Sequence, residues 1–375
     1  MDSRRWDEIK KSLQPTIKEW KFILNRIKKS PLSLVGVALI IFYILIAILA
    51  PVLAPPKPGA DPFMVPRDWL LLKRPILERT APIPPTTNHI FGTTEGQYDL
   101  YYGCIWGTIT AFRTGVYVTF FVLLIGLILG VVAAYYGGII DEILMRFTDI
   151  IIAFPGLILA MALVVAIPNV FNLNLSLIIS IVLAFLAALI LLSRRLKITV
   201  KIISEAILII AICVLLFVYK IEWMMTINNL DKVLISLVLV GWPGYTRVIR
   251  GEVLRVKNED YVEAARAIGC SDFRIITRHI LPNSVYPIII MASLDIGSIV
   301  LSAAALSFLG LGAPEGYADW GWLINISRGW IGQAGLFTYL HAFLIPGIFI
   351  FTFVLGWNLL GDAFRDILDP TLRRR

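Results

Sequence analysis

The sequence predicts an all-α integral membrane protein with about eight transmembrane helices. Apolar residues make up 58% of its 375 residues, charged residues only 16%, and the mean hydropathy is +0.80. A typical soluble domain has about 25% charged residues. The apolar residues also form uninterrupted runs near the ~20 residues that cross a bilayer. Residues 32–53 are one such run and contain no charged residue.

Eight apolar runs are candidate spans: residues 32–53, 115–136, 147–168, 175–192, 202–219, 232–248, 284–308 and 338–360. The positive-inside rule predicts their orientation. With a cytosolic N-terminus, the segments on the inner side hold 25 of the 34 Lys and Arg residues. We therefore expect a multi-pass protein of the cell membrane with both termini in the cytosol. These loops, rather than nucleic-acid binding, explain the net charge of +8.

The spans divide the chain into segments. We expect a cytosolic N-terminal segment (1–31), a first transmembrane helix (32–53), an external loop (54–113), a transmembrane domain (114–361) and a basic cytosolic tail (362–375). Nine of the 20 prolines lie between residues 55 and 88. Because proline fixes φ and donates no backbone hydrogen bond, the external loop should be irregular. Its length favours a docking surface over a simple connector.

The strongest functional pattern lies in residues 258–283, which the span count places in the cytosol. Acidic residues open a predicted helix, where the helix dipole favours them, and Gly269 stands at a helix-stop position. Ser271 can cap a second short helix that ends before Pro282. One face of the first helix carries Tyr261, Ala264, Ala265 and Ile268. These residues fit an amphipathic hairpin on the membrane surface and a partner-docking element equally well.

The spacing of this segment resembles the EAA loop of permease subunits in binding-protein-dependent ABC importers. The matching residues are Glu263, Ala264, Ala265, Gly269, Leu281 and Pro282, while His279 replaces the usual isoleucine. Further blocks resemble the C-type permease of the dipeptide, oligopeptide and nickel branch, at residues 91–93, 141–155, 242–250, 307–321 and 358–370.

The resemblance implies a non-catalytic subunit that forms half of a pathway for di- or oligopeptides. Its implied partners are a second homologous permease, two ATPase subunits that hold ATP and Mg²⁺, an external substrate-binding protein and the lipid bilayer. The implied ATPase-coupling residues are Tyr261, Glu263, Ala264, Ala265, Ile268, Gly269, Leu281 and Pro282. The chain has no Gly-Lys pair, which a nucleotide-binding P-loop requires. We expect no cofactor and no metal on this subunit.

Two other hypotheses remain open at this point. Some members of the branch carry oligosaccharides or nickel instead of peptides. A secondary transporter or channel working alone is the alternative of a different class, and it predicts inverted repeats and charges at mid-membrane. No such repeat is visible in the sequence.

Two segments depart from the family pattern. The family usually has six spans, so residues 175–219 form an additional two-helix hairpin, which preserves the topology and which we expect to be dispensable. Residues 94–99 read Thr-Glu-Gly-Gln-Tyr-Asp, where the family tends to show D-E-x-G-R-D. The arginine of that pattern is missing.

Several single residues are candidates for the pathway or for helix pairing. Arg146 and Asp149, three residues apart, fit a structural pair better than a functional site. Asp295 can either line the pathway or bond a neighbouring helix. Three prolines, Pro155, Pro243 and Pro346, are expected to interrupt the hydrogen-bond ladder of helices within the membrane and to mark pore-facing or hinge regions. Gly126 and Gly130 form a G-x-x-x-G pattern, which predicts close helix packing.

Overall fold

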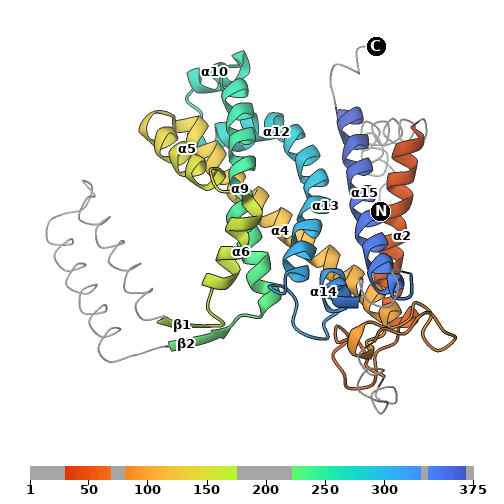
Figure 1. Cartoon of the computed structure of the whole chain (residues 1–375). Coiled ribbons are helices and arrows are strands. Elements are labelled where there is room, and N and C mark those ends of the chain that lie inside the picture. The colour runs from red at the N-terminus through yellow and green to blue at the C-terminus, as the bar shows by residue number, and fades with distance from the viewer. Residues whose placement is uncertain (1–29, 69–80, 175–221, 331–336, 369–375) are drawn as a thin grey trace, which may run out of the picture. The chain divides into compact units, whose positions relative to one another are not determined.

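A computed structural model describes residues 30–68, 81–174, 222–330 and 337–368 (Figure 1). These residues are almost entirely helical. Five helices are long and apolar enough to cross a membrane: α2 (Pro31–Leu53), α4 (Leu100–Tyr136), α9 (Asn229–Lys257), α13 (Tyr286–Phe308) and α15 (Leu340–Leu368). They confirm five of the predicted spans. The two predicted spans of the additional hairpin, 175–192 and 202–219, lie outside the described residues.

The predicted span at 147–168 is not one continuous helix. Helix α5 (Gly138–Ile152) and helix α6 (Gly156–Ala166) are bent by 90° relative to each other. Pro155 lies in the break, where it donates no hydrogen bond and disfavours helical geometry at Phe154. Pro243 and Pro346 lie inside α9 and α15, which continue through them.

Two segment boundaries also differ from the prediction. Helix α4 begins at Leu100, inside the predicted external loop, because Asp99 caps it: its Oδ1 accepts a hydrogen bond from the Tyr102 N–H at 2.8 Å. Helix α15 continues to Leu368, into the predicted cytosolic tail. The end of α15 contains Asp362, Arg365 and Asp366, so hydropathy alone does not extend that span to Leu368.

Close packing between helices depends on small residues. A Cβ atom at Gly126 would lie 2.5 Å from Cβ of Tyr245, and one at Gly130 would lie 2.8 Å from the Thr246 carbonyl oxygen. The G-x-x-x-G pattern of α4 therefore packs against α9, as predicted. At the other side of the bundle, α2 packs on α15, where the Tyr43 hydroxyl donates to the Phe349 carbonyl at 3.0 Å.

The bundle carries short helices at both of its ends. Helix α10 (Asp260–Ala267) lies at one end of α9, and helix α14 (Trp320–Ser327) lies with the Pro-rich loop at the other end of the bundle (Figure 1). A core of aromatic residues holds α14 in place, with Trp320 beside Tyr43 and Phe353.

A separate unit covers residues 166–228. Its described part is a two-stranded antiparallel sheet, in which β1 (Val170–Asn174) pairs with β2 (Glu222–Thr226), Val170 opposite Thr226. The strands flank the predicted hairpin in the sequence.

Candidate coupling site

The predicted helix–turn–helix is present in residues 260–284. Helix α10 ends at Ala267, and Gly269 follows with φ of +80°, the left-handed conformation expected at a helix stop. Helix α11 (Asp272–Ile275) continues through a π-helical turn (Ile276–Ile280) into α12 (Leu281–Ser284). A Cβ atom on Gly269 would meet open space, so only its backbone conformation restricts substitution.

Two details of the prediction are wrong. Ser271 occupies the N-cap position, but its side chain makes no capping hydrogen bond. The second helix does not end before Pro282, which lies in the first turn of α12. The π-helical turn precedes this proline. In it, the Leu281 N–H donates to the Ile276 carbonyl, five residues back, and this wider hydrogen-bonding pattern accommodates Pro282. Side chains of Asn283 and Ser284 then satisfy nearby carbonyls, at 2.7 and 2.9 Å.

The predicted apolar face of α10 is divided between two surroundings. Tyr261 and Ile268 are 42% and 80% exposed, and Ala264 is exposed as well. Ala265 is only 5% exposed and packs, together with Val262, on the permease core. The rotation of α10 about its axis decides which of these residues face the core. The sequence spacing shows only that they share one side of the helix.

Phe273 is an exposed residue that the sequence reasoning missed. It lies just beyond the turn, and its side chain is 77% exposed. Two large apolar side chains, Ile268 and Phe273, are thus exposed on one short loop. Exposed apolar groups that cluster in this way mark an interaction surface. Of the remaining predicted coupling residues, Glu263 and Pro282 are exposed, and Leu281 is partly buried against the core.

Lys257 and Tyr135 connect this loop to the end of α4. The Lys257 ammonium donates to the carbonyls of Ala134 and Tyr135, at 3.1 and 2.6 Å. These carbonyls lie at the negative end of the α4 dipole, where a cation is favourable. The Tyr135 hydroxyl in turn donates to the Asp272 carboxylate at 2.5 Å. The ends of α4, α9 and α11 are therefore held by one polar cluster.

Helix α5 is attached to α9 by two ion pairs. Arg250 holds Asp141 in a bidentate contact, with both N–O distances at 2.6 Å, and Arg247 contacts Asp149 at 2.5 Å. The predicted pair between Arg146 and Asp149 is wrong. Asp149 turns towards α9, and Arg146 lies 3.9 Å from Glu142 at the surface.

Asp295 lies near the middle of α13 and lines a cavity of about 230 Å³. Residues of α4, α6, α9 and α13 surround this cavity, and its polar lining comes from Asp295, Ser298 and Ser302. The Tyr245 hydroxyl of α9 also faces Asp295, without a hydrogen bond of good geometry. The structure thus places Asp295 both at a cavity and beside a neighbouring helix.

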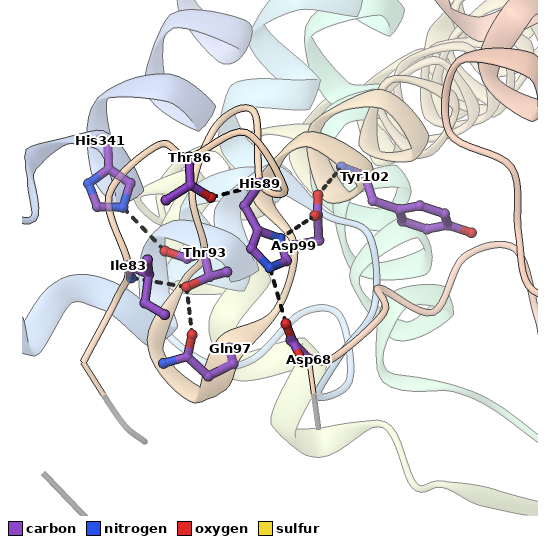
Figure 2. Close-up of polar contacts among 9 residues, drawn as sticks. All are labelled: Asp68, Ile83, Thr86, His89, Thr93, Gln97, Asp99, Tyr102 and His341. Carbon is purple, nitrogen blue, oxygen red and sulfur yellow. Dashed lines mark hydrogen bonds and ion pairs between the residues drawn. The ribbon is translucent and has the colours of Figure 1, made fainter. Parts of the chain in front are cut away.

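The loop that precedes α4 is ordered by a polar network around His89 and Thr93 (Figure 2). The His89 ring contacts the carboxylates of Asp99 and Asp68, at 2.9 and 3.3 Å. Partial burial disfavours the charged imidazole, but these hydrogen bonds outweigh it and raise the pKa of His89 above its usual 6.5. Because Asp99 also caps α4, the network fixes the loop to the first turn of that helix.

The departure at residues 94–99 has a structural explanation. Gln97 stands where the family shows glycine, and its φ of +64° is the left-handed conformation that glycine adopts without strain. Its buried side chain donates to the Ala81 carbonyl at 2.8 Å and accepts from the Thr93 hydroxyl at 2.8 Å. Tyr98 stands at the arginine position, and the Arg67 guanidinium lies 4.6 Å from its ring centre. Arg67, which comes from an earlier segment of the chain, thus places a positive charge beside the position where the family pattern has arginine.

No group of three or more His, Cys, Asp or Glu side chains is placed to hold a metal ion in the part of the chain that the structure describes. The three histidines of the sequence lie on separate segments: His89 in the loop before α4, His279 in the π-helical turn (Ile276–Ile280) and His341 in α15.

Comparison with known proteins agrees with this architecture. Residues 180–374 match the family of binding-protein-dependent transport system inner membrane components, and residues 19–71 match the N-terminal transmembrane domain of oligopeptide transport permease C. A dipeptide transport system permease of Alkalihalophilus pseudofirmus is 30% identical over 95% of this chain and 91% of that protein. A probable D,D-dipeptide transport permease of Escherichia coli K12 is 32% identical, over 92% and 89%.

An oligopeptide transport system permease of Bacillus subtilis is 27% identical over 95% of this chain and 90% of the relative. The family match covers more than half of the chain, and the relatives align over nearly its whole length. This chain belongs to the inner-membrane permease components of binding-protein-dependent ABC transport systems, in the C-type group of the dipeptide and oligopeptide branch.

Proposed function

We propose that this chain forms half of the translocation pathway of an ATP-driven importer for di- or oligopeptides. A second homologous permease completes the pathway, and an external binding protein delivers the solute. Two separate ATPase subunits bind ATP and Mg²⁺, and residues 258–283 dock in a groove on one of them. Both termini and this loop face the cytosol of the cell membrane. The observation that carries the proposal is the exposed apolar pair Ile268 and Phe273 on a helical hairpin.

The contacts of the hairpin support a coupling role. ATP binding draws the two ATPase subunits together and moves the docked hairpins. Lys257 and the Tyr135–Asp272 hydrogen bond connect each movement to α4. Helix α5 moves with α9, since Asp141 and Asp149 are paired with arginines of that helix. The helices can then rock between outward-open and inward-open arrangements, and hydrolysis resets the cycle.

The names of the relatives favour peptides as the transported solute. Dipeptide, D,D-dipeptide and oligopeptide systems are among them. Oligosaccharides and nickel remain the alternatives within the same class of transporter. A secondary transporter working alone is the alternative in another class, and it requires no ATPase on the hairpin.

Copurification of the ATPase subunits tests the proposal. We expect Phe273→Glu to lower the amount of ATPase recovered with the two permeases at least tenfold, because it places a charge in an apolar contact. Ile90→Glu is the matched control: Ile90 is 60% exposed and lies in the external loop. Retention of the second permease shows that the variant has folded. Normal ATPase recovery with Phe273→Glu would refute the docking site.

A further inference from the structure

We propose that Asp295 binds the ammonium group of the transported peptide, in a polar site on α13 within the membrane. This inference rests on the peptide-import function proposed above and adds the group that recognises the solute inside the pathway. Three observations carry it: the depth of the carboxylate in the membrane, the cavity that it lines, and the polar groups around it.

Asp295 lies about half-way through the 23-residue helix α13. At 1.5 Å of rise per residue, this position is about 14 Å from the helix start, close to the centre of a ~30 Å hydrocarbon layer. Ser298 and Ser302 follow on the same face. The Ser298 hydroxyl is 3.3 Å from the Asp295 carboxylate, and the Ser302 hydroxyl donates to the Ser298 carbonyl at 2.9 Å.

These three side chains are the polar lining of the cavity. The remaining wall is apolar and includes Val122 of α4, Leu157 of α6 and Val240 of α9. A volume of about 230 Å³ is below the ~300 Å³ at which binding pockets for whole ligands begin. The cavity therefore suits one end of a solute, while the rest of the molecule extends into the pathway.

Asp295 has no cationic partner among the ion pairs of the described residues. The side chains that interact with it there are Tyr245 and Ser298, neither of which is a cation. A carboxylate at this depth is costly unless a counter-charge or hydrogen bonds compensate it. The Tyr245 hydroxyl is also buried, faces the carboxylate, and makes no hydrogen bond of good geometry. Among the described residues, the site thus holds a negative charge beside a tyrosine hydroxyl but lacks a positive group.

An ammonium group fits this arrangement better than the other candidate solutes. It donates three hydrogen bonds, and the site offers a carboxylate with two nearby hydroxyl oxygens as acceptors. Imidazole is a ligand that suits nickel, and the cavity lining contains no histidine. A neutral sugar would leave the buried carboxylate without a counter-charge.

The test uses the complete complex, with both permeases, the ATPase subunits and the binding protein, in proteoliposomes. Uptake of dialanine and its stimulation of ATP hydrolysis are measured for wild type, Asp295→Asn and Asp295→Glu. Asparagine keeps the shape and removes the charge, whereas glutamate keeps the charge. Glu142→Gln is the control, since Glu142 is an exposed carboxylate of α5 outside the cavity.

We expect Asp295→Asn to lower dialanine uptake at least tenfold while ATP hydrolysis stays within twofold of wild type. Asp295→Glu should recover most of the uptake. Uptake by Asp295→Asn within twofold of wild type would overturn the site. Equal losses of uptake and hydrolysis, or an equal defect in Asp295→Glu, would also overturn it, because they indicate a structural role. Absence of ATP-dependent dialanine uptake by the wild type would instead refute the proposed function.

Discussion

The hydroxyl of Tyr135, at the end of α4, donates a hydrogen bond to the carboxylate of Asp272, at the start of α11, over 2.5 Å. The two residues are 137 positions apart in the sequence. The bond connects a membrane-spanning helix directly to the second half of the hairpin. Lys257 adds a second connection, from the end of α9 to the carbonyls of α4.

We expect Tyr135→Phe to weaken the coupling of ATP hydrolysis to uptake several-fold. A hydrogen bond to a charged group contributes about 1.5–3 kcal/mol, and its loss lets the hairpin move without α4. The measurement is the ratio of dialanine uptake to ATP hydrolysed in proteoliposomes. Tyr136→Phe is the matched control, because the neighbouring tyrosine is 55% exposed. An unchanged ratio in Tyr135→Phe would show that the bond plays no part in coupling.

Gly269→Asp should leave the permease in the membrane but separate it from the ATPase. The φ of +80° makes any side chain cost about 1 kcal/mol in strain. The added side chain also points into open space, where the ATPase is proposed to dock. Stimulation of ATP hydrolysis by the loaded binding protein should be lost, and Glu263→Lys should show a smaller loss.

Gly251→Asp is the control for this prediction. Gly251 is an exposed glycine of α9 whose added Cβ would also meet open space, and its φ lies outside the left-handed region. Wild-type stimulation and uptake in Gly269→Asp would remove the main support for the coupling loop.

The ion pair between Asp141 and Arg250 should be testable by charge reversal. Asp141→Arg or Arg250→Asp alone places like charges together, and each should destabilise the α5–α9 contact by about 1–2 kcal/mol. The double reversal should recover part of the loss, as seen in the melting temperature of the purified complex. Glu142→Lys, at a side chain that is 70% exposed, should have little effect. Equal destabilisation in the double variant would contradict the pairing.

The external loop should lose stability as the pH rises through the raised pKa of His89. The folded protein binds the His89 proton more tightly than the unfolded chain, whose histidine titrates near 6.5. The stabilisation is therefore complete below about pH 6.5 and is lost above the folded pKa. Limited proteolysis at residues 54–99 should accelerate as the pH rises through the raised pKa of His89. His89→Gln should remove that pH dependence, and a persisting dependence would assign it to another group.

Single-cysteine labelling tests the proposed orientation. After Cys104, Cys213 and Cys270 are replaced, a cysteine at Asn258 should resist a membrane-impermeant reagent in intact cells. A cysteine at Gly59, in the external loop with open space around its Cβ position, should react. Labelling at Asn258 in intact cells would reverse the topology.

The sequence by itself determined the positions of five spans, the helix stop at Gly269 and the packing role of Gly126 and Gly130. Each of these depends on local properties: a run of apolar side chains long enough for a bilayer, or a glycine where the backbone needs one. Such properties are the same whichever helices lie nearby.

Only the tertiary structure decided which side chains meet. The rotation of α10 on the core buries Ala265 and leaves Ile268 exposed. Because α5 packs on α9, Asp149 forms an ion pair with Arg247 and not with Arg146, although Arg146 is closer in sequence. Tyr135 and Asp272 are 137 residues apart, so no local pattern could pair them. These contacts follow from how helices rotate and cross when they pack, which depends on all of their neighbours at once.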